Sequence, residues 1–189
     1  LGGGYGRGEG GVLRDGAGEA PYNDLEFYVC LRGNRWRNER RWGRALPELA
    51  HQLTPEAGIE VELKLFSLSQ LRRAPVSMFY YDLVLGHRWV LGEERLLRGC
   101  EHHRHAERIP LAEATRLLMN RGTGLLLARA RLERKPGSAD DADFAGRNIA
   151  KAQLALGDAL LTALGRYHWS CLERERRLEA VSGDWPWLD

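Results

Sequence analysis

Two segments in the first half of the chain alternate between apolar and polar residues, or run apolar, as β-strands do. They are residues 24–31 and 59–65. Between them, the apolar residues of segment 38–53 recur every three or four positions, and this pattern ends before Pro55 and Gly58. The first half therefore predicts a strand, a glycine turn, a strand, a helix and a further strand.

The second half of the chain has a helical pattern almost throughout. Ahead of it, segment 77–85 fits a short helix or a strand, and segment 88–92 favours another strand. Helices are expected over residues 111–132, 143–164 and 167–181, with a polar break at 135–141. We expect an α+β protein of two domains. A mixed sheet with flanking helices spans residues 1–107, and a helical bundle spans residues 108–189.

Composition sets limits on the class of protein. The chain has 189 residues, 43% of them hydrophobic, which supports an ordinary buried core. Its 28 basic residues nearly balance its 26 acidic ones, so long nucleic acid is not an expected partner and any attraction to polyanions must come from local patches. No segment is long and apolar enough to span a membrane. The three cysteines lack metal-binding or disulfide spacing, which favours a reducing cytoplasm.

Each of two polar segments could be a binding site or simply a solvent-exposed segment. Five arginines lie between Arg35 and Arg44, interleaved with Trp36 and Trp42, and resemble a nucleic-acid-binding patch. The alternative is an amphipathic helix with a solvated basic face. The histidines within residues 102–105 have a spacing that could touch a metal, but no nearby cysteine or carboxylate motif completes a site. A solvated linker is the favoured interpretation there.

The chain opens with a glycine-rich turn that is suited to binding phosphate. Glycines occupy positions 3, 4, 6 and 8, and the lack of side chains lets backbone N–H groups approach phosphate oxygens closely. Gly3, Gly4 and Gly6 are the candidate phosphate-binding glycines. Arg7 adds a planar guanidinium donor to the same turn.

An acidic pair follows the turn on a predicted strand. Residues two apart on a strand point to the same face, so Asp24 and Glu26 could share a magnesium ion. Like charges placed side by side are unfavourable unless a cation neutralises them, so the pair requires a partner. The same reasoning applies to Glu60 and Glu62 on the later strand.

Residues 3–9 followed by Asp24-Leu25-Glu26 resemble the signature of the DNA polymerase beta-like nucleotidyltransferase superfamily, and the turn is most similar to that of PII-protein uridylyltransferases. The resemblance implies transfer of a nucleoside monophosphate from a nucleoside triphosphate to a hydroxyl, with release of pyrophosphate. It also implies that Asp24 and Glu26 bind magnesium together with a third carboxylate, Glu62 or Glu60, of which Glu62 is the favoured candidate. Segment 59–63 is similar to the strand that supplies a catalytic acid in aminoglycoside nucleotidyltransferases.

The helical half resembles the C-terminal domains of small bacterial nucleotidyltransferases, which implies that a lysine of an interior helix reaches the nucleotide. Lys151 is the candidate, with Arg147 beside it on one helical stripe. Asp158 follows on the same stripe. It could activate the acceptor hydroxyl, or it could be a buried aspartate paired with an arginine for structural reasons.

The acceptor and the degree of activity stay open. A small molecule or a protein side chain could accept the nucleotide, and the protein could form oligomers. Glu26 stands where the family usually has aspartate, and nineteen residues separate Gly4 from Asp24, a connection that could be a flexible insert. These two departures support a rival interpretation, a nucleotide-binding sensor with weak or no catalysis. A further rival is an RNA-modifying nucleotidyltransferase.

Overall fold

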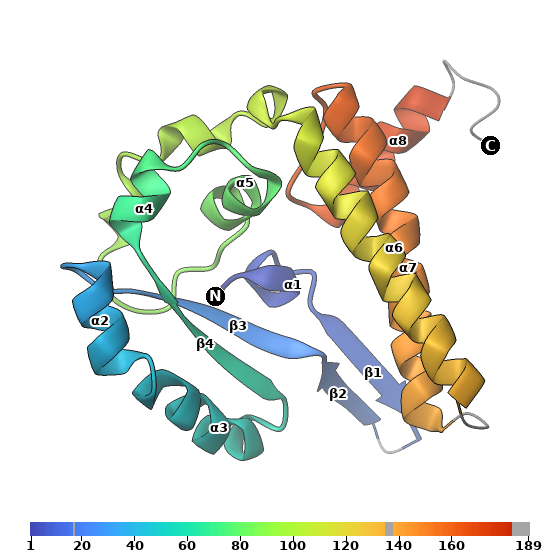
Figure 1. The fold of residues 1–189 in the computed structure, drawn as a ribbon, viewed down its shortest axis with the longest axis horizontal. Helices are drawn as coiled ribbons and strands as arrows, with labels where there is room; N and C mark the ends of the chain where they lie inside the picture. Colours follow the sequence, from blue (N-terminus) through green and yellow to red (C-terminus); the bar gives the residue numbers. More distant parts are fainter. Residues whose placement is uncertain (17, 135–137, 183–189) are drawn as a thin grey trace. The chain divides into compact units, whose positions relative to one another are not determined.

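The computed structural model describes residues 1–16, 18–134 and 138–182, and the chain divides into two compact units (Figure 1). Unit 1 is Leu1–Arg104 and unit 2 is His105–Asp189, so the division comes slightly before the expected boundary at residues 107 and 108. The protein is α+β, because strands occur beside helices in unit 1 and the described elements of unit 2 are helical. Across the described residues, the helices are all too short or too polar to cross a bilayer.

Unit 1 begins with a short helix and a β-hairpin. Helix α1 covers Gly3–Gly6, and strands β1 (Gly11–Asp15) and β2 (Gly18–Tyr22) pair antiparallel, with Gly11 opposite Tyr22. In the long connection between the glycine turn and the acidic strand, where the sequence suggested a flexible insert, the described residues therefore form a β-hairpin.

The second sheet of unit 1 is a parallel pair. Strand β3 (Asp24–Cys30) pairs with β4 (Glu60–Phe66), close to the predicted strands. Among the described residues, the strands form two separate two-stranded sheets, where a single mixed sheet was expected. A parallel pair needs a crossover connection between its strands. Here helices α2 (Arg35–Trp42) and α3 (Ala45–Ala57) provide it.

The crossover is two helices, although the apolar pattern predicted one helix over residues 38–53. Pro47 explains the break, because a proline within a helix cannot donate to the carbonyl four residues earlier and its ring clashes with that carbonyl. In a continuous helix the clashing carbonyl would be that of Gly43. The chain instead ends α2 before Gly43 and places Pro47 in the first turn of α3.

The rest of unit 1 packs around a small apolar core. Helices α4 (Leu68–Arg73) and α5 (Met78–Leu85) are followed by the 3₁₀ turns η1 (Glu94–Leu97) and η2 (Glu101–Arg104). The ambiguous segment 77–85 is therefore helical. Residues 88–90, within the expected strand at 88–92, have no regular structure, although Arg88 N donates to Leu1 O at 2.9 Å.

His103 belongs to this core, so the prediction of a solvated histidine linker is wrong at this position. Its side chain is fully buried with those of Leu71 and Cys100, and its Nε2 lies 2.9 Å from Leu71 O. Burial lowers the pKa of His103 below its usual value, because the protonated ring would lose its hydration. His103 is therefore a neutral structural residue near pH 7.

Unit 2 is built from the helices α6 (Leu111–Arg134), α7 (Ala139–Ala163) and α8 (Cys171–Ser182), preceded by the 3₁₀ turn η3 (Ala106–Arg108). Helices α6 and α7 lie side by side (Figure 1). A Cβ atom at Gly124 of α6 would collide with the side chain of Asn148 on α7, so this glycine permits the close approach of the two helices. Residues 135–137 of the predicted polar break lie outside the described residues.

Helix α7 starts earlier than the expected position 143 because Ser138 caps it. The Ser138 side chain accepts a hydrogen bond from Asp141 N, and acidic residues in the first turn suit the positive end of the helix dipole. The broad apolar face predicted for this helix is only partly buried. Leu161 is fully buried, whereas Ile149, Leu154 and Leu156 are each more than half exposed in the chain by itself.

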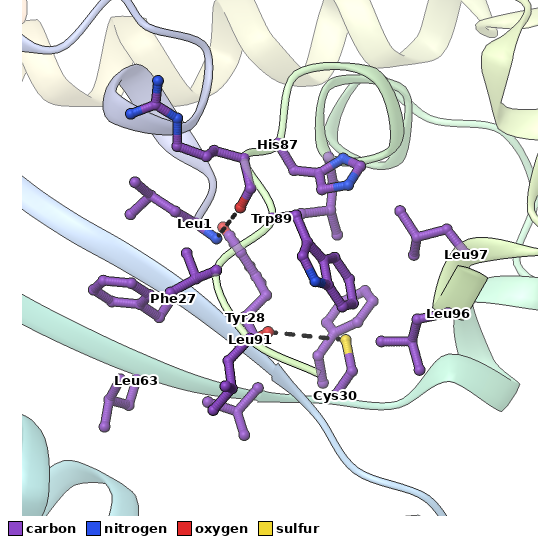
Figure 2. Close-up of a pocket in the computed structure, with 15 residues that line it drawn as sticks. Leu1, Phe27, Tyr28, Cys30, Leu63, His87, Trp89, Leu91, Leu96 and Leu97 are labelled. Carbon is purple, nitrogen blue, oxygen red and sulfur yellow. Dashed lines mark hydrogen bonds between the residues drawn. The ribbon is translucent and has the colours of Figure 1, made fainter. Parts of the chain in front are cut away.

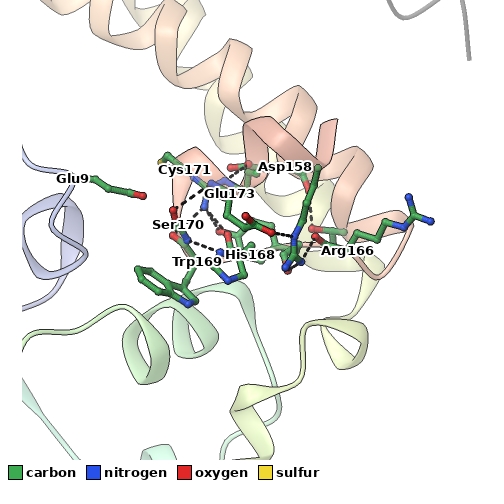
Figure 3. Close-up of polar contacts among 12 residues, drawn as sticks. Glu9, Asp158, Arg166, His168, Trp169, Ser170, Cys171 and Glu173 are labelled. Carbon is green, nitrogen blue, oxygen red and sulfur yellow. Dashed lines mark hydrogen bonds and ion pairs between the residues drawn. The ribbon is translucent and has the colours of Figure 1, made fainter. Parts of the chain in front are cut away.

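Polar contacts that include Asp158 and His168 fix the turn between α7 and α8 (Figure 3), and the buried Arg174 makes several of them. Arg174 Nε lies 2.7 Å from Asp158 Oδ1 on α7, and its Nη1 donates to His168 O at 2.8 Å. Arg177 Nη1 donates to Arg166 O at 2.9 Å. These side chains satisfy the carbonyl groups of an irregular segment, so α8 begins at Cys171 and not at the expected position 167.

We predict that Arg174→Ala lowers the free energy of unfolding by about 3–5 kcal/mol, because it removes the cation that compensates the largely buried Asp158 carboxylate. Arg176→Ala is the matched control. Its side chain is 78% exposed, so its effect should stay within about 0.5 kcal/mol. Urea unfolding followed by circular dichroism measures both, and equal effects would show that Arg174 does not hold unit 2 together.

Candidate functional site

The acidic residues of the two parallel strands lie next to one another because the strands pair in phase. Asp24 is opposite Glu60, Glu26 is opposite Glu62, and Tyr28 is opposite Lys64. Side chains two apart on a strand share a face, so all six residues belong to one face of the sheet. The sequence predicted each acidic pair on one strand face, and the parallel register joins the two pairs.

Three of the four carboxylates converge. One oxygen each from Asp24, Glu26 and Glu62 lies within 4.8 Å of the others, and all three side chains are partly exposed. We call these residues the acidic cluster. Glu60 is exposed and lies outside it, so of the two candidates for the third carboxylate only Glu62 joins the pair from β3.

The charge of the cluster affects its protonation. Burial, and then the neighbouring charges of Glu26 and Glu62, raise the pKa of Asp24 above its ordinary value. Burial and the nearby Glu26 also raise the pKa of the Tyr28 hydroxyl to about 12, so this phenol is neutral at physiological pH. The site therefore resists additional negative charge and favours a cation.

Lys64 supplies a cation within the protein. Its Nζ lies 2.5 Å from Glu26 Oε1 and 2.5 Å from Glu62 Oε2, and 5.9 Å from the centre of the Tyr28 ring. Burial alone would lower the pKa of Lys64, but the hydrogen bonds to Glu26 and Glu62 outweigh it and raise the pKa. Lys64 thus stays charged and neutralises part of the cluster.

The sequence contained a signal for Lys64 that was missed. Glu60, Glu62 and Lys64 are spaced by two along one strand, which places the ammonium on the acidic face.

The glycine turn packs directly on the acidic strand. Gly2 N donates to Glu26 O at 2.8 Å. Gly3 has φ +60°, and a Cβ atom there would lie 2.5 Å from Glu26 Oε2, so only glycine fits without displacing the carboxylate. The turn and the acidic cluster, which are far apart in sequence, therefore form one continuous site.

Other residues of the turn have structural contacts. Arg7, the candidate phosphate ligand, forms an ion pair with Glu9 at 3.3 Å. The Tyr5 hydroxyl donates to Gly11 O at 2.6 Å and accepts from Tyr22 N at 2.9 Å, which ties the turn to both ends of the hairpin. A Cβ atom at Gly6 would collide with Leu1 O, so this glycine also serves packing.

A cavity of about 350 Å³ lies beside β3 (Figure 2). Side chains from β3, from residues 87–91 and from η1 line it, most of them apolar, as labelled in the figure. Tyr28 and Leu63 line the cavity and belong to the strands that carry the acidic cluster. This volume and lining are typical of small-molecule sites. The scattered lining residues gave no signal in the sequence.

The candidate residues of the helical half all lie on α7 in unit 2. Lys151 is exposed, and Arg147 Nε forms an ion pair with Asp143 Oδ2 at 2.9 Å. Asp158 is paired with Arg174, which is the structural arrangement that the sequence left open beside a catalytic one. All three residues belong to unit 2, whereas the acidic cluster belongs to unit 1.

No family model, curated protein or solved structure matches this chain. The arrangement of its own residues is therefore the basis for a proposal about function.

We predict that Gly3→Ala lowers the free energy of unfolding by about 1–3 kcal/mol more than Gly8→Ala does. Both glycines have positive φ, at +60° and +76°, so both substitutions carry similar backbone strain. Only the Cβ at position 3 would meet Glu26, because nothing lies within 4 Å of a Cβ at Gly8. Urea unfolding compares the two variants, and equal losses would contradict a tight contact between the turn and Glu26.

Proposed function

We propose that this chain is a magnesium-dependent nucleotidyltransferase of the DNA polymerase beta-like superfamily. It would transfer a nucleoside monophosphate from a nucleoside triphosphate to a hydroxyl group. The hydroxyl oxygen forms a bond to the α-phosphorus while the bond to the departing pyrophosphate breaks. The observation that carries the proposal is the contact of the Gly2–Gly3 turn with Glu26, inside a cluster that also contains Asp24 and Glu62.

The donor set of the cluster fits magnesium. Magnesium prefers carboxylate oxygens, and Asp24, Glu26 and Glu62 present three such groups close together. One carboxylate oxygen of the cluster, Glu62 Oε2, is buried and lies 2.5 Å from Lys64 Nζ, so a cation already contacts it. When bound, the metal would neutralise charge on the triphosphate and favour attack by the hydroxyl.

The chain's own residues would bind and orient the nucleotide. The first backbone hydrogen bond of α1 runs from Gly6 N to Gly2 O at 2.9 Å, so the amides of Gly3 and Gly4 have no partner within the helix. These amides would donate to phosphate oxygens, and Arg7 would add its guanidinium if it leaves Glu9. The apolar cavity beside β3 supports a small molecule over a protein side chain as acceptor.

Lys64 favours one alternative function. Its ammonium already lies between Glu26 and Glu62, where a metal ion would need the same oxygens. A site neutralised in this way suits a sensor that binds nucleotide with little turnover. Binding and turnover therefore have to be measured separately.

The acidic cluster predicts that Glu62→Gln lowers magnesium-dependent pyrophosphate release by about 100-fold or more, since loss of one charge-stabilising group commonly costs 10²–10³ in rate. Glu60→Gln is the matched control, because this glutamate lies on the same strand but outside the cluster. The assay uses each of the four nucleoside triphosphates with a panel of small hydroxyl compounds. Calorimetry with a nontransferable nucleotide and magnesium measures binding by itself.

The outcomes separate the two functions. Pyrophosphate release that depends on Glu62 supports the transferase. Magnesium-dependent nucleotide binding without release under any acceptor supports the sensor. An equal loss for Glu60→Gln and Glu62→Gln would contradict the assignment of the third carboxylate, and absence of nucleotide binding would contradict both functions.

Lys64→Met should lower the melting temperature without metal, because the glutamates lose the charge that neutralises them. Added magnesium should then stabilise the variant more than the wild-type protein, because the ammonium no longer competes for the same oxygens and ligand binding raises stability by mass action. Lys151→Met, which alters an exposed lysine of unit 2, should change neither quantity. Equal magnesium stabilisation of all three proteins in thermal scans would show that Lys64 and the metal do not compete.

A further inference from the structure

Helix α2 contributes no side chain to the core of unit 1. None of its residues is buried, and both of its tryptophans are exposed. Local contacts account for the helix. Asn34 caps it by accepting from Trp36 N at 2.9 Å, and Arg35 pairs with Glu39 at 2.8 Å. Packing within unit 1 therefore does not account for the presence of arginines and tryptophans on α2.

The arginines of α2 are arranged unfavourably for an isolated helix. Three arginines of the helix are spaced three and four positions apart, at Arg37, Arg40 and Arg41. Arg44 follows at the same spacing, and its backbone angles are also helical. Like charges at these spacings lie on one side of a helix and each such pair costs about 0.2–0.5 kcal/mol. Among the described acidic side chains, none forms an ion pair with any of these four arginines. This surface therefore has an uncompensated positive charge.

The tryptophans add flat aromatic surfaces to this charge. Trp36 is 64% exposed and Trp42 is 39% exposed. The guanidinium carbon of Arg40 lies 5.5 Å from the Trp36 ring centre, and that of Arg41 lies 5.1 Å from the Trp42 ring centre. We call residues 36, 37, 40, 41 and 44 the Arg–Trp surface.

We infer that the Arg–Trp surface binds single-stranded nucleic acid, with arginines on the phosphates and Trp36 stacked on a base. Exposed aromatic rings beside arginines are the combination that unpaired bases and their phosphates require. The inference does not depend on the proposed nucleotidyltransferase activity. It is compatible with the near-neutral charge of the whole chain, because the attraction comes from one local patch.

Two other anionic partners fit this surface less well. A duplex keeps its bases stacked, so it could use the arginines but not Trp36. A helix that lies in a membrane surface needs a continuous apolar face. The two tryptophans of α2 are six positions apart and fall on different sides of the helix, so no such face exists on it.

The test is fluorescence anisotropy of labelled 12-residue oligonucleotides with the full chain, over a series of salt concentrations. Oligouridine and oligothymidine separate RNA from DNA. The double variant Arg37→Gln with Arg41→Gln should weaken binding about 10-fold or more at low salt. It should also make the slope of log affinity against log salt concentration shallower by about 1.4, because each of the two lost phosphate contacts contributes about 0.7. Trp36→Ala should weaken binding about 5- to 100-fold, and Trp36→Phe should restore most of it.

The matched control is Arg116→Gln with Arg129→Gln, which removes two exposed positive charges from α6 and should leave oligonucleotide binding within about 2-fold. Circular dichroism confirms that each variant is folded. The inference is overturned if the wild-type chain binds no oligonucleotide, or if the control weakens binding as much as the α2 variant. It is also overturned if duplex binds as tightly as single strands, or if only phosphatidylserine vesicles bind.

Discussion

The parallel, in-phase pairing of β3 and β4 is the constraint on which the rest of unit 1 depends. It brings Glu26 beside Glu62 and Tyr28 beside Lys64, although the residues of each pair are 36 positions apart in sequence. A shift of the register by one residue would turn one set of side chains to the opposite face. Such a shift would disrupt the acidic cluster, its contact with Lys64 and the contact of the glycine turn with Glu26.

The electrostatics of the cluster follow from this pairing. Two unit charges 4 Å apart interact by about 4 kcal/mol at an effective dielectric constant of 20. Carboxylates as close as those of Asp24, Glu26 and Glu62 therefore destabilise the fold unless cations offset them. Lys64 supplies one positive charge, which leaves the cluster negative. A stable fold and an affinity for a further cation are thus compatible in one site.

Much of this arrangement could be predicted from local sequence patterns. The alternation over residues 24–31 and 59–65 gave both strands and the shared face of each acidic pair, because period two is a property of a single strand. The register between the strands depends on tertiary structure, so the sequence offered no physical ground for favouring Glu62 over Glu60. The same holds for the cavity lined by Tyr28 and Trp89, whose residues come from separate segments.

Two features that were not predicted nevertheless have a signal in the sequence. Pro47 lies in the middle of the expected helix 38–53 and breaks it. The period-two spacing from Glu62 to Lys64 placed the lysine on the acidic face. The pairing of Asp158 with Arg174 had no local signal, because the partners lie on different helices.

The hairpin between the glycine turn and β3 has a consequence for how this protein can vary in evolution. The Tyr5 hydroxyl bonds to Gly11 and Tyr22, the pair at the base of the hairpin. From this pair the two strands are regularly paired up to Asp15 and Gly18. Insertions or deletions that add or remove whole cross-strand pairs beyond this base would leave the turn and Asp24 in place. Related chains could therefore differ widely in the length of this connection and still share the same site.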